Sequence, residues 1–403
     1  MPMTVSPPPV VPAMTPRLAF LLAFSCGAIG ANLYYAQPLI ALIGPDVGLA
    51  SHVASLVVTL TQIGYGLGLV LLVPLGDIIE NKRLITISVG ITALALTLTA
   101  LAPSALPFLG AALFIGFSSS VIQMLVPLAA SMTDEDSRGR TVGNVMSGLM
   151  VGILLARPIA GLLSGLVGWR GVFGLSAALM IVLLTLLLRF LPRRRPASGQ
   201  SYGALLASLW TITRATPLLR RRSIYQFFLF ADFSLFWTAV PLELSGPAFN
   251  YTQAQIALFT LAGAAGALSA PLAGRLADRG HTRAGTGAAI LGVMLAFALA
   301  GLAGNLASIA LMTIVALLLD FCVQANTVFG QRALYVLAPE IRNRLNGLYI
   351  ATFFIGGALG SALASPLYET GGWPAIVIAG LAFPVVSLAY FLTEFRPGQA
   401  RAG

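Results

Sequence analysis

Apolar runs of about 20 residues recur along almost the whole of this chain, and that is the length a helix needs to cross a lipid bilayer. Hydrophobic residues make up 58% of the 403 residues and charged residues only 9%, whereas soluble domains carry about 25% charged residues. So few charges cannot cover the surface of a water-soluble fold. The sequence therefore predicts an all-α protein that crosses a membrane repeatedly, and it excludes a cytosolic enzyme, a nucleic-acid-binding domain and a disordered chain.

The N-terminal segment and the cysteines add no further domain. Residues 1–16 are rich in Pro, which predicts a disordered tail. The apolar run after Arg17 has no small-residue cleavage site, so we expect a first membrane span there and not a removed signal peptide. Cys26 and Cys322 each lie inside an apolar run without CxxC spacing, which indicates neither a disulfide framework nor a metal site.

Twelve spans are expected from the apolar runs, in two sets of six separated by the longest break in the chain. The first set is 18–43, 51–75, 84–102, 106–131, 141–166 and 171–191, and the second set is 223–245, 254–275, 284–302, 305–331, 345–367 and 373–393. Since some runs are short or closely joined, eleven and thirteen spans remain alternatives.

The distribution of Lys and Arg predicts the orientation of these spans. With the N-terminus inside the cell, 21 of the 23 Lys and Arg residues fall in inner segments. The two exceptions are Arg157, within a span, and Arg170, at the outer face. Cytoplasmic loops of membrane proteins carry such an excess of positive charge, so we expect both termini in the cytoplasm and the chain in the inner (plasma) membrane. A basic face toward anionic lipid headgroups also accounts for the net charge of +10 without nucleic acid.

The two sets of spans resemble each other. Shifting the chain by 204 residues superposes five residues of one loop-and-span segment: Arg138, Arg140, Gly143, Gly152 and Trp169 fall on Arg342, Arg344, Gly347, Gly356 and Trp373. An even number of spans separates the copies, so they share one orientation. Such parallel repeats are typical of transporters with a substrate site between the two halves.

The repeat and the longest break define the expected domains. They are a cytoplasmic tail (1–16), an N-terminal six-helix bundle (17–191), a cytoplasmic linker (192–222), a C-terminal six-helix bundle (223–394) and a second tail (395–403). Within the linker, Tyr202, Leu205, Leu206, Leu209 and Trp210 recur at helical spacing. This stripe predicts an amphipathic helix, either on the inner membrane surface or as a solvated connection.

One loop of the second half carries a specific motif. Residues 274–283 read GRLADRGHTR and resemble the G-x-L-A-D-R-x-G-R-R loop of the major facilitator superfamily, with His281 where Gly is usual. The first half has a more divergent copy, Leu75-Gly76-Asp77 followed by Lys82 and Arg83. The segment 32–39, NLYYAQPL, is similar to the first span of bacterial drug and sugar:proton antiporters of that superfamily.

This resemblance implies a twelve-helix fold of two bundles that work by alternating access, with the two loops as gates. Asp77, Asp278, Arg279 and Arg283 are the expected gating residues, because an acidic group at a helix end can form and break charge-assisted hydrogen bonds. Asp77 and Asp278 as ordinary solvated charges are the alternative. Exporters of the superfamily commonly carry a Gly-Pro pair in the fifth span, and here the pair is Arg157-Pro158.

Small residues recur every four positions in the fifth, eighth and eleventh spans, for example at Gly148, Gly152, Gly356 and Gly360. Such ladders allow close backbone approach. Either they line a moving seam between the halves or they pack helices statically.

Three ionisable residues lie within predicted spans: Arg157, Asp232 and Asp320. Each is costly in lipid and should face protein or a water-filled cavity. Asp320, Gln324, Thr327 and Gln331 share one helix face, which favours a hydrated path over helix–helix hydrogen bonding. An apolar cavity favours the protonated form of a carboxyl group, so Asp320 and, second, Asp232 are candidate proton carriers. A permanent ion pair with Arg157 is the alternative.

The remaining candidates form the wall of a substrate cavity. They are Asn32, Tyr35 and Gln37 from the first span, Gln123 from the fourth, and Gln226 and Trp237 from the seventh. Phe230 and Phe233 share the last helix face but could equally face lipid or core. Aromatic groups with a few amides suit a small organic molecule with apolar parts.

Together these features predict a secondary active transporter, with proton-coupled efflux of small organic or amphipathic compounds as the leading function. A proton-coupled sugar or organic-acid transporter, in either direction, is the alternative. A polytopic membrane enzyme is disfavoured, because the only acidic cluster, Asp134-Glu135-Asp136, has no His beside it. No phosphate-binding G-x-x-x-x-G-K-[ST] loop occurs, so we expect no cofactor, the proton gradient as energy source, and a functional monomer whose partners are its substrate and the bilayer.

Overall fold

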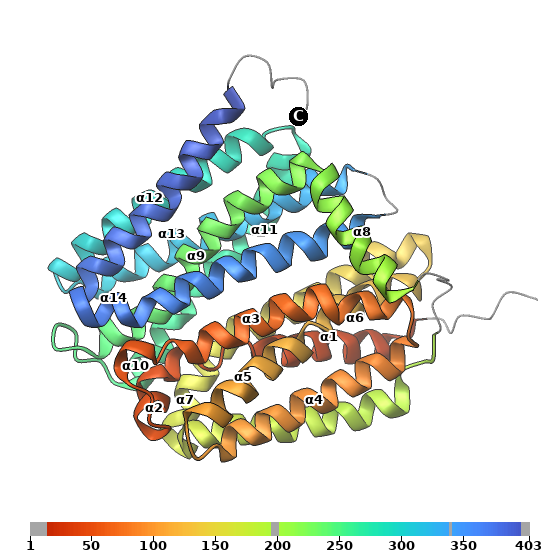
Figure 1. Ribbon diagram of the computed structural model, residues 1–403, viewed down its shortest axis with the longest axis horizontal. Helices are drawn as coiled ribbons and strands as arrows, with labels where there is room; N and C mark the ends of the chain where they lie inside the picture. Colours follow the sequence, from red (N-terminus) through yellow and green to blue (C-terminus); the bar gives the residue numbers. More distant parts are fainter. Residues whose placement is uncertain (1–13, 195–200, 338–340, 396–403) are drawn as a thin grey trace, which may run out of the picture.

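The computed structural model describes residues 14–194, 201–337 and 341–395. Most of the predicted tails 1–16 and 395–403, and the middle of the predicted linker, lie outside the described residues. The expected all-α architecture is confirmed, since every regular element in the described ranges is a helix. Figure 1 shows two groups of helices lying side by side, with α8 (Tyr202–Ala215) next to their right-hand ends. We call that end of the molecule the linker end.

The first group contains the elements before the linker. They are α1 (Pro16–Ala31), η1 (Gln37–Leu39), α2 (Ile40–Asp46), η2 (Ser51–Val53), α3 (Leu56–Leu71), η3 (Val73–Asp77), α4 (Asn81–Leu101), α5 (Ala105–Ser119), α6 (Ile122–Ser131) and α7 (Glu135–Phe190). The start of α1 is capped: the Thr15 side chain accepts a hydrogen bond from the amide of Leu18, and Pro16 occupies the first helical position, where no amide proton is needed.

The second group follows α8. Its elements are α9 (Pro217–Ser245), α10 (Gln253–Phe259), η4 (Thr260–Ala264), α11 (Ala265–Asp278), α12 (Thr282–Asn305), α13 (Ile309–Tyr335), α14 (Arg342–Leu392) and η6 (Thr393–Phe395). A reciprocal pair of hydrogen bonds between Thr252 and Gln255 starts α10, which satisfies two amide groups at that helix end.

Eight helices in the described part of the chain are long and apolar enough to cross a membrane. Two of them, α7 and α14, have 56 and 51 residues, which is enough for two crossings each at about 20 residues per crossing. Each is interrupted by a glycine with a positive φ angle: 70° at Gly168 and 61° at Gly372. Glycine adopts this backbone region without a steric penalty. Both breaks lie between two of the spans that the sequence predicts.

Four predicted spans are not single continuous α-helices: 51–75 includes η2 and η3 beside α3, 106–131 divides into α5 and α6, and the other two are more irregular. The span at 18–43 leaves the helix after Ala31, passes through turns to Ala36 and re-enters helix at Gln37. The span at 254–275 changes from α10 through η4 to α11. Irregular backbone at membrane depth is tolerated where protein covers it, and residues 31–40 are all buried. These two irregular segments supply residues to the candidate site.

The glycine ladders pack helices within each group. A Cβ atom on Gly152 would collide with the backbone of Gly27 in α1, and one on Gly360 would collide with the backbone of Ala231 in α9. These glycines therefore let α7 approach α1, and α14 approach α9, at backbone distance. The sequence left open whether the ladders line a moving seam between the halves or pack helices statically. Because these glycines contact helices of their own group, static packing agrees with the structure.

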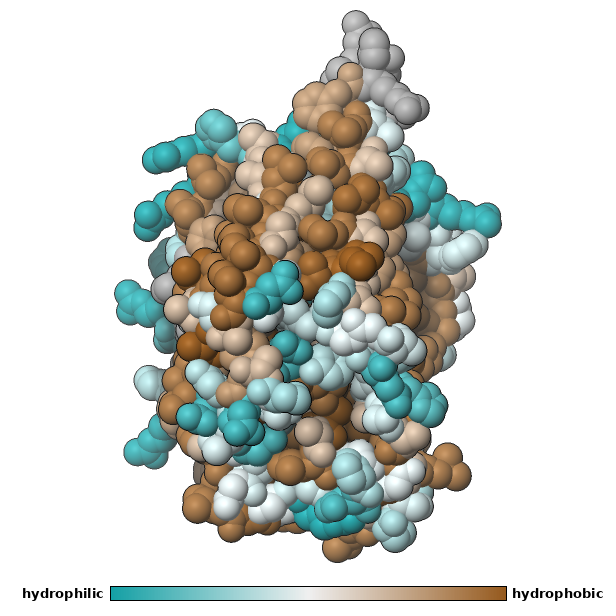
Figure 2. Space-filling model, turned by 90° about the vertical axis from the view of Figure 1, so that its left-hand side faces the viewer, coloured by the Kyte–Doolittle hydropathy of each residue, from teal (hydrophilic) through white to brown (hydrophobic). Residues whose placement is uncertain are grey.

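The two groups touch each other at the end opposite α8. Thr59 and Ser361 share a hydrogen bond of 2.9 Å, the amide of Ser55 donates to the Ser365 hydroxyl at 3.0 Å, and Gln62 Nε2 donates to the Ser234 hydroxyl at 2.7 Å. These contacts join α3 to α14 and α9. Figure 2 looks onto this end, where hydrophilic side chains gather across the middle below a largely hydrophobic upper part. We call this end the closed end.

Candidate functional site

A cavity of about 1210 Å³ lies between the two groups of helices. Residues from both groups line it, and Arg193, Arg194, Leu205 and Leu209 of the linker line it as well. The cavity therefore extends toward the linker end. Its volume exceeds that of typical small-molecule pockets, which measure about 300–1,000 Å³.

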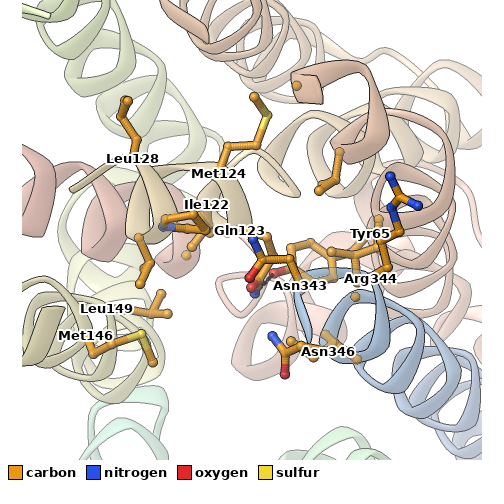
Figure 3. Close-up of a pocket in the computed structure, with 18 of the residues that line it drawn as sticks. Tyr65, Ile122, Gln123, Met124, Leu128, Met146, Leu149, Asn343, Arg344 and Asn346 are labelled. Atoms are coloured by element: carbon orange, nitrogen blue, oxygen red, sulfur yellow. Dashed lines mark hydrogen bonds between the residues drawn. The ribbon is translucent and has the colours of Figure 1, made fainter. Parts of the chain in front are cut away.

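The cavity wall has a polar and an apolar side. Figure 3 shows Ile122, Met146 and Leu149 on the left, with Asn343, Arg344 and Asn346 on the right. Gln123, predicted from the sequence, lines the cavity and donates a hydrogen bond to the Tyr65 hydroxyl at 3.1 Å. Such a wall suits a small organic molecule with both apolar and polar parts.

The polar stripe of α13 reaches the cavity in part. Gln324, Thr327 and Gln331 line it, whereas Asp320, one turn further from the linker end, is not among the lining residues. Thr327 also accepts a hydrogen bond from Gln226 at 2.6 Å, and Gln331 donates to Asn346 at 3.0 Å. Both interpretations of the stripe thus apply: the same side chains line the cavity and bond neighbouring helices.

Arg157 lies buried beyond the cavity, in a cage of aromatic rings. Its side chain is 4% exposed, and its guanidinium carbon lies 5.0, 5.2 and 4.5 Å from the ring centroids of Tyr34, Phe233 and Trp237. Cation–π contacts of this kind stabilise a desolvated guanidinium by about 2 kcal/mol. Arg157 Nε also donates a hydrogen bond to Gln37 Oε1 at 2.7 Å.

Asp320 faces the same cage. Trp237 Nε1 donates to Asp320 Oδ1 at 2.6 Å, so one indole ring touches both buried charges. A Cβ atom on Gly263, in η4, would lie 3.0 Å from Asp320 Oδ2 and 3.3 Å from Arg157 Nη1. Among the ion pairs of the described residues there is none between Arg157 and Asp320. The absence of a side chain at Gly263 leaves the two charges facing each other at short range without direct contact.

Asp232 is separate from this cluster. It is fully buried, and neither carboxyl oxygen has a hydrogen-bond partner among the described residues. The structure therefore does not bring Asp232 and Arg157 together as an ion pair.

Two other predicted residues bond within their own group. Asn32 accepts a hydrogen bond from the Ser176 hydroxyl at 2.6 Å, and Gln226 accepts one from Asn326 at 2.7 Å. Both are buried, and neither they nor the buried Tyr35 lines the cavity. These three side chains lie between packed helices in this structure.

The two loops with the acidic motif have different partners. Asp77 lies 3.8 Å from Arg344, at the start of α14, so this ion pair joins the two groups. Asp278 pairs with Arg332 at 3.3 Å within the second group. Arg283 pairs with Glu394 at 3.4 Å, and Arg279 is exposed. Among the ion pairs of the described residues, the divergent loop copy connects the groups and the well-matched copy does not.

Several residues at the site were not predicted. Tyr34 and not Tyr35 faces Arg157, Tyr65 lines the cavity, and Gly263 adjoins both charges. Tyr34 stands next to a predicted residue, but the irregular backbone at 32–36 makes its direction unpredictable from helical spacing. Among the described residues, no cluster of His, Cys, Asp and Glu suits a metal ion.

Comparison with known proteins places the chain in a family. The model of the Major Facilitator Superfamily matches residues 19–242 and 222–402. The chain is 40% identical over 388 residues to the putative uncharacterized transporter YgaY of Escherichia coli K12, covering 96% of this chain and 98% of that protein. It is 32% identical to the probable transporter SCO4007 of Streptomyces coelicolor over 94% of this chain and 87% of that one.

More distant similarity extends to a transporter with a named substrate and to a solved structure. The chain is 28% identical to the 3-(3-hydroxy-phenyl)propionate transporter of Escherichia coli K12, over 76% of this chain and 78% of that protein. The crystal structure of a mutant of the nucleoside transporter NupG shares the fold with a TM-score of 0.75 at 16% identity, covering 94% of this chain and all of that one. With a family model that spans nearly its whole length and close relatives that are transporters, this chain belongs to the Major Facilitator Superfamily and is a bacterial multi-pass membrane transporter.

Proposed function

We propose that this transporter is a secondary active carrier that works by alternating access and exports small organic or amphipathic compounds across the inner membrane in exchange for protons. The observation that carries the proposal is the cavity between the two groups, which extends toward the linker end and stops short of a buried Asp320–Trp237–Arg157 cluster. Members of the superfamily are transporters and not enzymes, and they typically need no cofactor.

The same proposal includes twelve spans in two parallel six-helix bundles, 17–191 and 223–394, joined by the linker 192–222, with both termini cytoplasmic. Its support is the equivalence of Gly168 and Gly372, which break α7 and α14 with positive φ and stand at the same 204-residue offset as the repeated residues. Counting each broken helix as two spans turns the eight long apolar helices into ten spans, and the irregular segments at 18–43 and 254–275 are the remaining two that the sequence predicts. The Lys and Arg distribution favours a cytoplasmic location for the linker end.

Proton coupling is assigned to Asp320. Its stripe on α13 continues through Gln324, Thr327 and Gln331 along the cavity, which supports a hydrated path between Asp320 and the linker end. The ionised carboxylate accepts a hydrogen bond from Trp237 and is attracted by the positive charge of Arg157. The protonated form carries no charge and loses the attraction to Arg157. Such a change in charge shifts the equilibrium between two arrangements of the same helices. Asp232, without any partner among the described residues, is the second candidate.

The alternative is a proton-coupled organic-acid or sugar transporter, in either direction. Arg157 favours an organic acid as the substrate of this alternative, because it is a buried cation close to the cavity. Tyr34 both contacts Arg157 and lines the cavity, so the aromatic cage adjoins the cavity there.

The proposal is tested by proton flux in liposomes that contain only this protein, screened against drugs, sugars and organic acids. We expect substrate-dependent proton movement with the wild-type protein. Asp320→Asn, which mimics the protonated carboxyl group, should still bind and exchange substrate but should not accumulate it against a gradient.

The matched control is Asp46→Asn, because Asp46 also accepts a hydrogen bond from a tryptophan, Trp169, at 2.8 Å, but at the end of α2 and away from the cluster. This variant should keep gradient-driven transport. Wild-type accumulation by Asp320→Asn would contradict the assignment and would make Asp232→Asn the next variant to measure.

A further inference from the structure

The cage around Arg157 has hydrogen-bond donors without acceptors. Within the described residues, Arg157 Nη2 and Gln37 Nε2 are buried and have no hydrogen-bond partner. The orientation of the Gln37 amide is determined, since its Oε1 already accepts from Arg157 Nε. Both unsatisfied groups are therefore N–H donors, and a buried donor without an acceptor costs about 1–3 kcal/mol.

The acceptors of the cluster do not reach these two donors, since no ion pair among the described residues joins Asp320 to Arg157. Asp320 Oδ1 accepts from the Trp237 indole, and the rings of Tyr34, Phe233 and Trp237 offer only their faces to the guanidinium. A cationic ligand would meet the positive charge of Arg157, and a neutral one would leave that charge without a counter-charge in contact. A planar carboxylate has two acceptor oxygens and the charge that both donors require.

The route to Arg157 is aromatic. Phe230, Phe353 and Phe354 line the cavity and pack on one another, with ring centroids 4.8 and 5.1 Å from that of Phe230. Phe230 in turn stacks on Phe233 of the cage at 5.1 Å. Tyr34 lines the cavity and also contacts Arg157, so the cavity stops one ring short of the guanidinium. A flat apolar group can occupy the phenylalanine wall while its charged end reaches Arg157 once the Tyr34 ring turns aside.

We propose that Arg157 and Gln37 form the carboxylate subsite of this transporter and that its substrates are aromatic monocarboxylates. This inference rests on the proposed transport function and names its substrate class. It agrees with the name of one relative, the 3-(3-hydroxy-phenyl)propionate transporter, but the unsatisfied donors carry the argument.

The test is direct binding to the purified full-length protein, measured by calorimetry with three compounds of one shape: 3-phenylpropionate, its neutral amide and the corresponding amine, 3-phenylpropylamine. We expect the acid to bind about 10- to 100-fold more tightly than the amide, the ratio expected for hydrogen bonds to a charged group. Arg157→Gln should remove this preference. Arg214→Gln should keep it, because Arg214 also lies over a tryptophan, Trp210, at 4.4 Å, but both side chains are on the exposed face of α8.

A second variant covers the possibility that Arg157→Gln does not fold. Gln37→Glu places a built-in carboxylate beside the guanidinium, so it should retain or raise the melting temperature and weaken binding of the acid about tenfold or more, with the amide unaffected. Unchanged affinity for the acid in this variant would overturn the proposal.

Equal binding of acid and amide, tighter binding of the amine, or no binding of the acid at millimolar concentration would also overturn it. These failures differ from failure of the transport proposal. If liposomes still couple protons to a neutral or cationic compound, the substrate class alone is wrong. If no compound moves protons, the coupling is wrong, whereas an acid preference that depends on Arg157 still establishes the subsite.

Discussion

Trp237 donates its indole N–H to the carboxylate of Asp320 across 2.6 Å. The face of the same ring carries the guanidinium of Arg157, 4.5 Å from the centroid. Because the ring edge is the positive side of an indole and the face is the negative side, each charge meets the part of the ring that attracts it. Trp237 thus holds an anionic carboxylate and a cationic guanidinium close together, in a buried site, without a direct ion pair.

This arrangement predicts the effect of Trp237→Phe. The variant keeps a ring for Arg157 but removes the hydrogen bond to Asp320, which is worth about 2 kcal/mol to a charged acceptor. We expect gradient-driven accumulation to fall while substrate exchange continues. Trp210→Phe, which keeps a ring for Arg214 on α8, is the control and should transport normally. Full accumulation by Trp237→Phe in liposomes would show that the indole does not contribute to coupling.

The contacts at the closed end predict a reversible block. The amide of Ser55 bonds the Ser365 hydroxyl at 3.0 Å, and the amide of Ser365 bonds the Ser55 hydroxyl at 3.4 Å, so the two side chains are close enough for a disulfide. The double variant Ser55→Cys/Ser365→Cys should stop transport when oxidised and regain it after reduction, because the closed end must part during alternating access. Each single variant is the control, and the native Cys26 and Cys322 are buried. Transport by the oxidised double variant would contradict this mechanism.

The acidic loops predict a change in rate without a change in stability. Asp77 and Asp278 are 54% and 59% exposed in their ion pairs, and exposed pairs contribute about 0–1 kcal/mol to stability. Asp77→Asn and Asp278→Asn should therefore slow transport several-fold with nearly unchanged substrate affinity and melting temperature. Glu135→Gln, an acid of the first turn of α7, should leave the rate unchanged. A large loss of binding in either Asn variant would mean that the loops shape the substrate site.

The distribution of Lys and Arg predicts the membrane topology. Reporter fusions after residues 48, 104, 168, 249, 304 and 371 should all report the outer face, because the basic loops remain in the cytoplasm. Fusions at the linker, near residues 195 and 215, serve as cytoplasmic controls. Cytoplasmic signals at two or more of the first six positions would rule out the twelve-span arrangement.

The sequence by itself determined the class of this protein. Apolar runs of membrane length and few charges permit only a helical membrane protein, since unpaired backbone groups cannot be left in lipid. The loop GRLADRGHTR identified the superfamily that the comparisons establish. Helical spacing also placed Gln324, Thr327 and Gln331 together, and they do line one cavity, because residues three and four positions apart share one helix face.

Only the tertiary structure decided which of the candidate residues meet. Arg157, Trp237 and Asp320 come from α7, α9 and α13, and the packing of those helices brings them to one place. Where the backbone leaves the α-helix, at 32–36 and 260–264, the 3.6-residue period no longer gives the direction of a side chain. Tyr34 and Gly263 lie in those two segments, so spacing could not assign them to the cage, whereas the packed helices around them fix both positions.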